Sequence, residues 1–217
     1  TEDNNFLVRT PMLTEEQGNK IISSLTAKLG ENEILRNEHV GAIIGKELTL
    51  NALYALAIAS VLMVIYISFR FEFRFGIAAI ISLLHDVMIV LGIFSLLQIE
   101  VDSAFVAAIL TIVGYSVNDT IVIFDRIREN LRGKSKKEEW EMLVNRSIMQ
   151  TLARSINTVL TTLFPLIALL LVGGATIKVF ALALLIGISS GCYSSIFIAS
   201  PLWFDLNNYL ATKKARA

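Results

Sequence analysis

Two carboxylates lie in stretches of the chain that are otherwise almost free of charge. Asp119 is flanked by the polar residues Asn118 and Thr120, and Asp86 directly follows His85. A charged side chain in the middle of a membrane helix costs about 2.5–3.5 kcal/mol on insertion scales, so such a residue suggests a function. Asp119 and Asp86 are therefore the starting points of a functional hypothesis.

Arg154 is the expected partner of Asp119. It stands at the start of another apolar stretch and shares one helical face with Thr158 and Thr161. The two stretches run in opposite directions, so both charges lie at similar depth, and an arginine side chain is long enough to reach the carboxylate. Burial disfavours the charged form of Asp119 and a nearby Arg154 favours it, which would couple ion occupancy to helix movement. A static pair that fixes helix register and an arginine that only closes the helix at the interface are the alternatives.

His85 and Asp86 form a second candidate group, close to the middle of the bilayer. A carboxylate at this depth is suited to a second step of an ion relay, in which Thr158 supplies a further hydroxyl. His85 exchanges protons near neutral pH. Hydrogen bonding to neighbouring helices, with a role in packing alone, is the alternative.

Other chemistries find little support in the sequence. One Cys and two His do not provide a metal cluster within this chain. No glycine-rich loop precedes a Lys followed by Ser or Thr, as an ATP site requires. An intramembrane aspartyl protease needs two carboxylates that share a proton, whereas Asp86 and Asp119 are expected at different depths. We expect neither a metal nor a cofactor, and no enzymatic activity.

Five apolar stretches must position these residues. The chain has 217 residues, of which 54% are hydrophobic, and a mean hydropathy of +0.64. Each stretch meets the length of about 20 residues that a helix needs to cross the hydrocarbon core. The predicted fold is an all-α integral membrane bundle with spans at 48–69, 75–99, 103–124, 155–177 and 179–204. Zero net charge, with no basic run among aromatics, argues against a nucleic-acid partner.

The distribution of Lys and Arg predicts the orientation. The side that holds residues 70–74, the loop 125–154 and the tail 205–217 carries 13 basic residues, and the other side carries 6. Because Lys and Arg are enriched in cytoplasmic loops, we expect the N-terminal segment outside and the C-terminus in the cytoplasm. Within the loop 125–154 the chain breaks at Gly133, and an amphipathic helix from Trp140 to Leu152 is expected to lie on the inner surface before turning into the fourth span.

The outer segment, residues 1–47, reads as part of an α+β domain. A strand is predicted at Phe6–Thr10, a helix at Thr14–Leu29 and an extended piece at Glu33–Arg36. Thr14 and Gln17 have the spacing of a capping box. One helix and one or two strands give too small a core to fold alone. We expect the chain to be a fragment that lacks an upstream half-domain and an upstream membrane helix.

Small residues in the spans predict close helix contacts. Gly187 and Gly191, with Ser195, form a stripe at helical spacing in the last span, and Gly114 provides a similar position in the third. Cys192 lies in the same last span and reads as a small packing residue.

Several ordered motifs resemble one known family. GYSVNDTIVIFDRIREN at 114–130 occurs together with FRFEFRF at 69–75, LLHDV at 83–87 and QTLARSINT at 150–158. The chain is similar, from about Val40 to the end of the last span, to the SecF members of the SecD/SecF protein-export family.

This resemblance implies a fold and a function. The fold would be that of the RND (resistance-nodulation-division) superfamily, with six helices per half, of which this chain holds five, and with SecD as the other half. Members assist late steps of polypeptide translocation through the SecYEG translocon of the bacterial cytoplasmic membrane, driven by a proton or sodium gradient. YajC and YidC are further partners that it suggests, beside the unfolded polypeptide and the bilayer. The match assigns Asp119 to the family's essential carboxylate and Arg154 to the arginine of QTLARS.

Two other functions remain as alternatives. Half of an RND-type exporter of small molecules or lipids would need a large external domain between its first two helices. A scaffold that stabilises a translocon without transporting ions would not depend on Asp119. The residues around Asp119 suit either a proton or a sodium ion.

Overall fold

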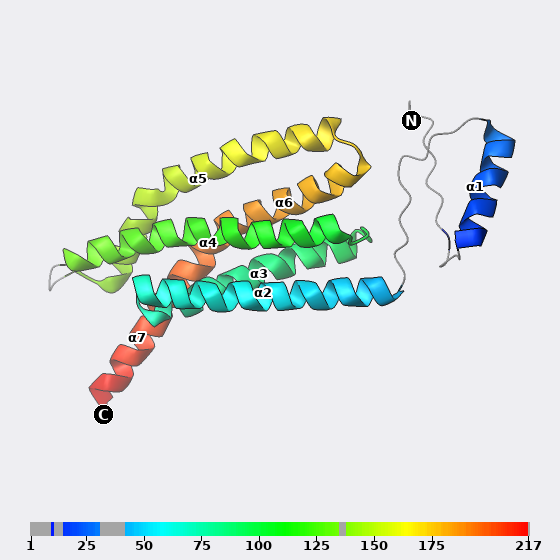
Figure 1. The fold of residues 1–217 in the computed structure, drawn as a ribbon. Coiled ribbons are helices and arrows are strands. Elements are labelled where there is room, and N and C mark those ends of the chain that lie inside the picture. The colour runs from blue at the N-terminus through cyan, green and yellow to red at the C-terminus, as the bar shows by residue number, and fades with distance from the viewer. Residues whose placement is uncertain (1–9, 11–14, 31–41, 135–137, 217) are drawn as a thin grey trace. The chain divides into compact units, whose positions relative to one another are not determined.

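The computed structural model describes residues 10, 15–30, 42–134 and 138–216, and these contain helices but no strand. Figure 1 shows the helices in chain order. Their bounds are α1 (Glu15–Leu29), α2 (Ala42–Arg70), α3 (Phe73–Leu96), α4 (Ser103–Arg132), α5 (Trp140–Val172), α6 (Ala175–Ser194), the π-helical segment η1 (Ser195–Ala199) and α7 (Ser200–Arg216). Five helical stretches among the described residues are long and apolar enough to cross a membrane, which confirms the predicted all-α membrane bundle.

The chain divides into two compact units, residues 1–51 and 52–217. In the first unit, α1 confirms the helix predicted at residues 14–29, and its apolar residues Ile21, Ile22 and Leu25 are half-buried. Thr14, the strand predicted at residues 6–10 (except Thr10) and the extended piece at 33–36 lie outside the described residues.

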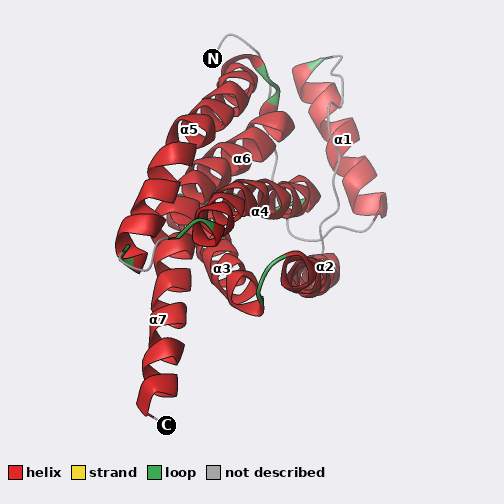
Figure 2. Ribbon diagram, turned by 90° about the vertical axis from the view of Figure 1, so that its left-hand side faces the viewer, coloured by secondary structure: helices red, strands yellow, loops and turns green. Residues whose placement is uncertain are grey.

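Helix α4 lies at the centre of the second unit. Figure 2 shows the bundle roughly end-on, with α4 between α3, α5 and α6. Its buried positions recur every three or four residues, as in a helix that is covered on most sides. They are Phe105, Ala108, Ile109, Ile112, Val113, Ser116, Val117, Asp119, Thr120, Ile123, Phe124 and Ile127. In contrast, α2 exposes most of its apolar length. Residues on α4 therefore face several helices at once.

Glycines bring α6 very close to α4. A Cβ atom at Gly187 would collide with the side chain of Ile112, and one at Gly191 would lie 3.1 Å from the Cβ of Ser116. Small residues allow such close approach of membrane helices. Gly114 differs from this pattern, since it lies on an exposed face of α4 with open space around its Cβ position. Among the described residues, Gly114 therefore makes no close helix contact of this kind.

The region 125–154 is mostly helical, not a loop with a separate surface helix. Helix α4 continues to Arg132 and ends at Gly133, where the break was predicted, and α5 runs without interruption from Trp140 to Val172. Leu143 and Val144, on the expected surface helix, are buried in the bundle. Hydrophobicity marks where a helix enters lipid, whereas backbone hydrogen bonds extend both helices beyond that boundary.

The connection between the last two spans also differs from the prediction. It lies at Gly173 and Gly174, so Lys178 belongs to α6. Position 173 requires glycine, because a Cβ atom there would collide with the carbonyl oxygen of Leu169. The predicted boundary followed the charge of Lys178, while the chain turns where glycine permits it.

One continuous helical run joins α6, η1 and α7. Pro201 lacks an amide hydrogen and its ring clashes with the carbonyl group four residues earlier, which favours a π-helical turn just before it. The Ser200 hydroxyl donates to the Ser195 carbonyl oxygen at 3.0 Å. Further along α7, the buried Trp203 stacks on Phe75 of α3 with ring centroids 4.5 Å apart. This stacking attaches the start of α7 to the start of α3.

Candidate functional site

Asp119 projects from α4 towards α5. The residue is only 7% exposed, and its Oδ1 accepts a 2.7 Å hydrogen bond from the hydroxyl of Ser155. Its other oxygen, Oδ2, is buried without a hydrogen-bond partner in the described chain. A buried polar atom without a partner is unfavourable, and a small cation at Oδ2 would satisfy it, whereas a proton there would remove the buried charge.

Arg154 does not form the direct ion pair with Asp119 that the sequence suggested. It is exposed, and none of the ion pairs found among the described residues joins it to Asp119. Successive residues of an α-helix point about 100° apart. Because Ser155 is directed at α4, the preceding residue, Arg154, points away from α4.

The neighbours of Asp119 separate into buried and exposed groups. Thr120 is buried; its hydroxyl donates to the carbonyl oxygen of Ser116 at 3.1 Å and lies 2.8 Å from the Ser195 hydroxyl, at the start of η1. Asn118 is exposed. Thr158 is exposed as well, and its hydroxyl donates to the carbonyl oxygen of Arg154 at 2.8 Å. Asp119 and Thr120 thus face the bundle, while Asn118, Arg154 and Thr158 face away from it.

Asp86 is fully buried at the meeting point of three helices. Its Oδ2 accepts hydrogen bonds from Ser116 of α4 at 2.6 Å and Ser194 of α6 at 2.7 Å. Its Oδ1 lies 2.8 Å from the donating hydroxyl of Ser190 and 3.2 Å from Nδ1 of His85. Both oxygens therefore have two partners each, which ties α3 to α4 and α6.

The two carboxylates have opposite hydrogen-bonding environments. Asp86 has a partner at every favourable position, whereas Asp119 has one satisfied oxygen and one buried oxygen without a partner. This geometry supports the packing alternative for Asp86, whereas Oδ2 of Asp119 remains a buried carboxylate oxygen without a partner among the described residues. Among the described residues, no three His, Cys, Asp or Glu side chains gather as a metal site requires.

Sequence reasoning missed the serine donors to the two carboxylates. Ser155 donates to Asp119, and Ser190 and Ser194 donate to Asp86. Ser190 and Ser194 are four residues apart and lie in the same stretch as Gly187 and Gly191. A serine in an apolar helix reads as a small packing residue, and only the packing of α3 against α6 shows that it is a donor. Ser155 could have been found by its position, since it directly follows Arg154.

A polar face on α4 and α5 is exposed within the membrane-spanning region. On α5 it consists of Arg154, Asn157, Thr158 and Thr161, and on α4 it includes Asn118. Tyr115 connects the two helices, because its hydroxyl donates to the carbonyl oxygen of Thr158 at 3.0 Å and lies 2.9 Å from the Thr162 hydroxyl. Charged and amide groups in a membrane face protein or a water-filled cavity, not lipid. This face therefore suits contact with a second membrane protein.

Comparison with known proteins agrees with these features. Residues 20–209 match the family described as "Protein export membrane protein SecD/SecF, C-terminal". The chain is 46% identical over 209 residues to the protein translocase subunit SecF of Sebaldella termitidis, covering 96% of this chain and 68% of the relative. It is 50% identical over 166 residues to the protein translocase subunit SecDF of Bacillus subtilis, covering 76% of this chain and 22% of that protein.

A solved structure shares the fold. The crystal structure of SecDF from Thermus thermophilus, described as a translocon-associated membrane protein, superposes with a TM-score of 0.82 at 45% identity. The superposition covers 90% of this chain and 27% of that protein. This chain thus spans about two thirds of the SecF relative from Sebaldella termitidis and about a quarter of the fused SecDF proteins. It is a multi-pass membrane protein that belongs to the SecD/SecF family of protein-export membrane proteins.

Proposed function

We propose that this chain is the SecF-type part of a protein-export complex that uses an ion gradient to assist late steps of polypeptide translocation across the bacterial cytoplasmic membrane. The observation that carries the proposal is the buried Oδ2 of Asp119, which has no partner although Ser155 fixes the other oxygen. A proton is the first candidate for the ion and sodium the second.

Ion uptake at Asp119 would change the forces between α4 and α5. Neutralising the carboxylate removes its attraction to Arg154 and weakens the hydrogen bond from Ser155, because a charged acceptor binds a donor more strongly than a neutral one. The helices then favour a different relative position. One proton that moves across about 100 mV releases about 2.3 kcal/mol, which is enough to shift such an equilibrium. Asn118, Thr120 and Thr158 border this path.

The exposed polar face of α4 and α5 is where we place SecD. Arg154, Asn118 and Asn157 would be poorly solvated by lipid and need a polar partner. Relatives that carry both parts in one chain are named SecDF. We further propose SecYEG and the translocating polypeptide as partners, and YajC and YidC as accessory ones.

We infer the orientation from the charged end of the bundle. Arg126, Arg128 and Arg132 lie near the end of α4, and Arg70 ends α2 at the same side, where its guanidinium lies 4.0 Å from the carboxylate of Asp125. Because basic residues favour the cytoplasmic side, this end would face the cytoplasm and the N-terminal segment the outside.

The test is gradient-dependent secretion of a preprotein by membrane vesicles that contain the full-length protein with SecD. Asp119→Asn keeps the size of the side chain but removes the titratable group. Asp125→Asn, an exposed position on the same helix, is the matched control. We expect the gradient-stimulated part of secretion to disappear with Asp119→Asn and to persist with Asp125→Asn, at equal amounts of assembled complex.

Two outcomes separate the alternatives. If Asp119→Asn assembles normally and keeps its full gradient stimulation, Asp119 has a structural role and the scaffold alternative stands. Dissipating the proton gradient and the sodium gradient separately, each with its own ionophore, shows which ion supports secretion in the wild type.

A further inference from the structure

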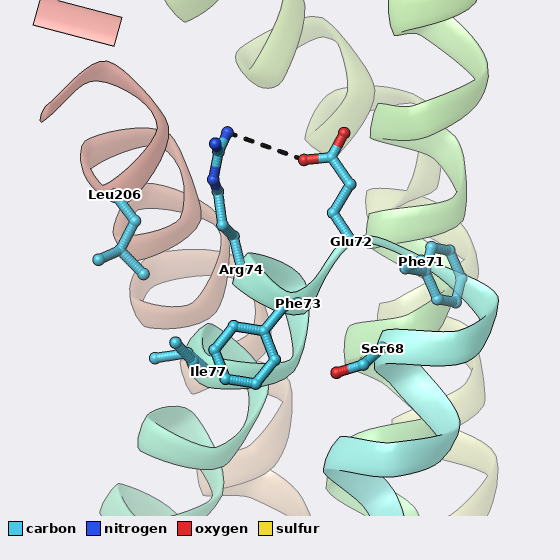
Figure 3. A pocket seen from close by; sticks show the side chains of 7 residues that line it. All are labelled: Ser68, Phe71, Glu72, Phe73, Arg74, Ile77 and Leu206. Atoms are coloured by element: carbon cyan, nitrogen blue, oxygen red, sulfur yellow. Dashed lines mark ion pairs between the residues drawn. The ribbon is translucent and has the colours of Figure 1, made fainter. Parts of the chain in front are cut away.

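A pocket opens where α2, α3 and α7 meet. It has a volume of about 540 Å³ and is lined by Ser68, Phe71, Glu72, Phe73, Arg74, Ile77 and Leu206. Figure 3 shows Arg74 and Glu72 at one end of the pocket, and Phe73 and Ile77 further along, between α2 and α7. One end is thus charged and the remainder mostly apolar.

The position of the pocket along the bundle places it at a membrane surface. Three membrane-spanning stretches have an end here, at Arg70, Phe73 and Asn208. Hydrocarbon therefore reaches the apolar part of the pocket, and lipid headgroups reach the charged part. Phe73 is 60% exposed, as expected of an aromatic residue that contacts lipid at the interface.

The charged end holds one cation and one anion in a loose pair. A nitrogen of the Arg74 guanidinium lies 3.8 Å from Oε2 of Glu72, which is too long for a hydrogen bond. Both side chains are accessible, at 36% and 67% exposure. The same guanidinium nitrogen donates a hydrogen bond to Oδ1 of Asn207, which holds Arg74 in place. The pair can therefore accept a ligand that carries both charges.

The start of α3 adds to the positive potential at this end. Glu72 is the N-cap residue of α3, but its side chain makes no capping hydrogen bond. The first amide groups of a helix carry partial positive charge and attract phosphate. Arg74 and the beginning of α3 thus favour a phosphate, while Glu72 stands beside them as an acceptor for an amine.

We propose that this pocket binds phosphatidylethanolamine. Arg74 would hold the lipid phosphate, Glu72 would accept hydrogen bonds from the primary ammonium group, and an acyl chain would lie along Phe73, Ile77 and Leu206. An anionic lipid such as phosphatidylglycerol offers Glu72 no cation, and the ammonium of phosphatidylcholine has no N–H to donate. The pocket therefore prefers an amine headgroup. This inference does not depend on the proposed ion coupling.

The test measures lipid binding to the full-length protein, purified in detergent and stripped of lipid. Each of the three lipids is added in turn, and bound lipid is counted by native mass spectrometry. We expect wild type to bind phosphatidylethanolamine about tenfold more tightly than the other two, the effect of about one charge-assisted hydrogen bond. Glu72→Gln removes this preference, and Arg74→Gln weakens the binding of all three.

Two control variants keep the test decisive. Arg126→Gln removes a cation that pairs with Glu129 on α4, outside the pocket lining, and it should leave binding unchanged. Asn207→Ala removes the hydrogen bond to Arg74 but keeps the charge of Arg74, so specific binding should persist in this variant. It gives an independent result if Arg74→Gln fails to fold. Equal affinity of wild type for the three lipids, or an unchanged preference for phosphatidylethanolamine in Glu72→Gln, would overturn the proposal.

Discussion

The hydroxyl of Ser155 donates a 2.7 Å hydrogen bond to Oδ1 of Asp119, which attaches one carboxylate oxygen of α4 to α5 and leaves Oδ2 buried without a partner. Arg154, the adjacent residue, is exposed and forms no ion pair with this carboxylate among the described residues. A displacement of α5 along its axis would therefore act on Asp119 through the Ser155 hydrogen bond, in a region where a low dielectric strengthens it.

The first prediction concerns Ser155. Ser155→Ala removes the hydrogen bond that directs Asp119 at α5, and we expect it to lower gradient-stimulated secretion several-fold, because a hydrogen bond to a charged group contributes about 1.5–3 kcal/mol. Ser155→Thr keeps the hydroxyl and should restore most of the stimulation. The measurement is vesicle secretion with matched amounts of complex. Equal loss in Ser155→Ala and Ser155→Thr would contradict a role of the hydroxyl.

The second prediction separates two roles of Arg154. The side chain is exposed and outside the ion pairs found among the described residues, so Arg154→Gln should leave the thermal stability of the purified protein nearly unchanged. The same variant should abolish gradient-stimulated secretion if Arg154 acts on Asp119. Lys178→Gln, an exposed cation on α6, is the control for loss of charge. A clear loss of stability in Arg154→Gln would instead indicate a static pair that fixes helix register.

The third prediction concerns the packing of Asp86. Asp86→Ala leaves the hydroxyls of Ser116, Ser190 and Ser194 without their acceptor, and at about 0.6–1.7 kcal/mol for each membrane hydrogen bond it should lower the free energy of unfolding by about 2–5 kcal/mol. The lower end is expected, because serines can bond to their own helix, as Ser194 already does towards the Gly191 carbonyl oxygen at 3.2 Å. Unfolding in mixed micelles measures the change. Ser190→Ala removes one donor and should cost much less; an equal cost for both variants would show that Asp86 does not join the helices.

The spans were predictable from sequence because long apolar stretches with few charges leave few alternatives to membrane helices. The ends of the spans were not predictable in the same way. Lys178 suggested a turn that actually occurs at Gly173, since backbone geometry and not charge decides where the chain turns. Asp119 was identifiable because a carboxylate in an apolar helix is rare. Its contact with Ser155 was not, because the register between α4 and α5 depends on packing that no single helix encodes.

The same reasoning explains why Asp86 was harder to interpret than Asp119. A buried carboxylate beside a histidine is compatible with an ion relay or with a packing role, and the difference lies in its partners. Those partners come from Ser116, 30 residues away, and Ser194, 108 residues away. Such distant contacts exist only once α3, α4 and α6 have packed together.

The last prediction tests how closely α4 and α6 must pack. Because a Cβ atom at Gly187 would collide with Ile112, Gly187→Ala should force the helices apart and lower the free energy of unfolding by about 1–3 kcal/mol. The separation would also weaken the bond between Thr120 and Ser195, one turn or more along the same interface. Gly92→Ala on α3, where a Cβ atom has open space, is the matched control and should have little effect. Ile112→Ala removes all three side-chain carbons that would collide with the new methyl group, so the double variant should be more stable than the sum of the two single effects predicts. If the two effects simply add, the contact with Ile112 is not the cause of the loss.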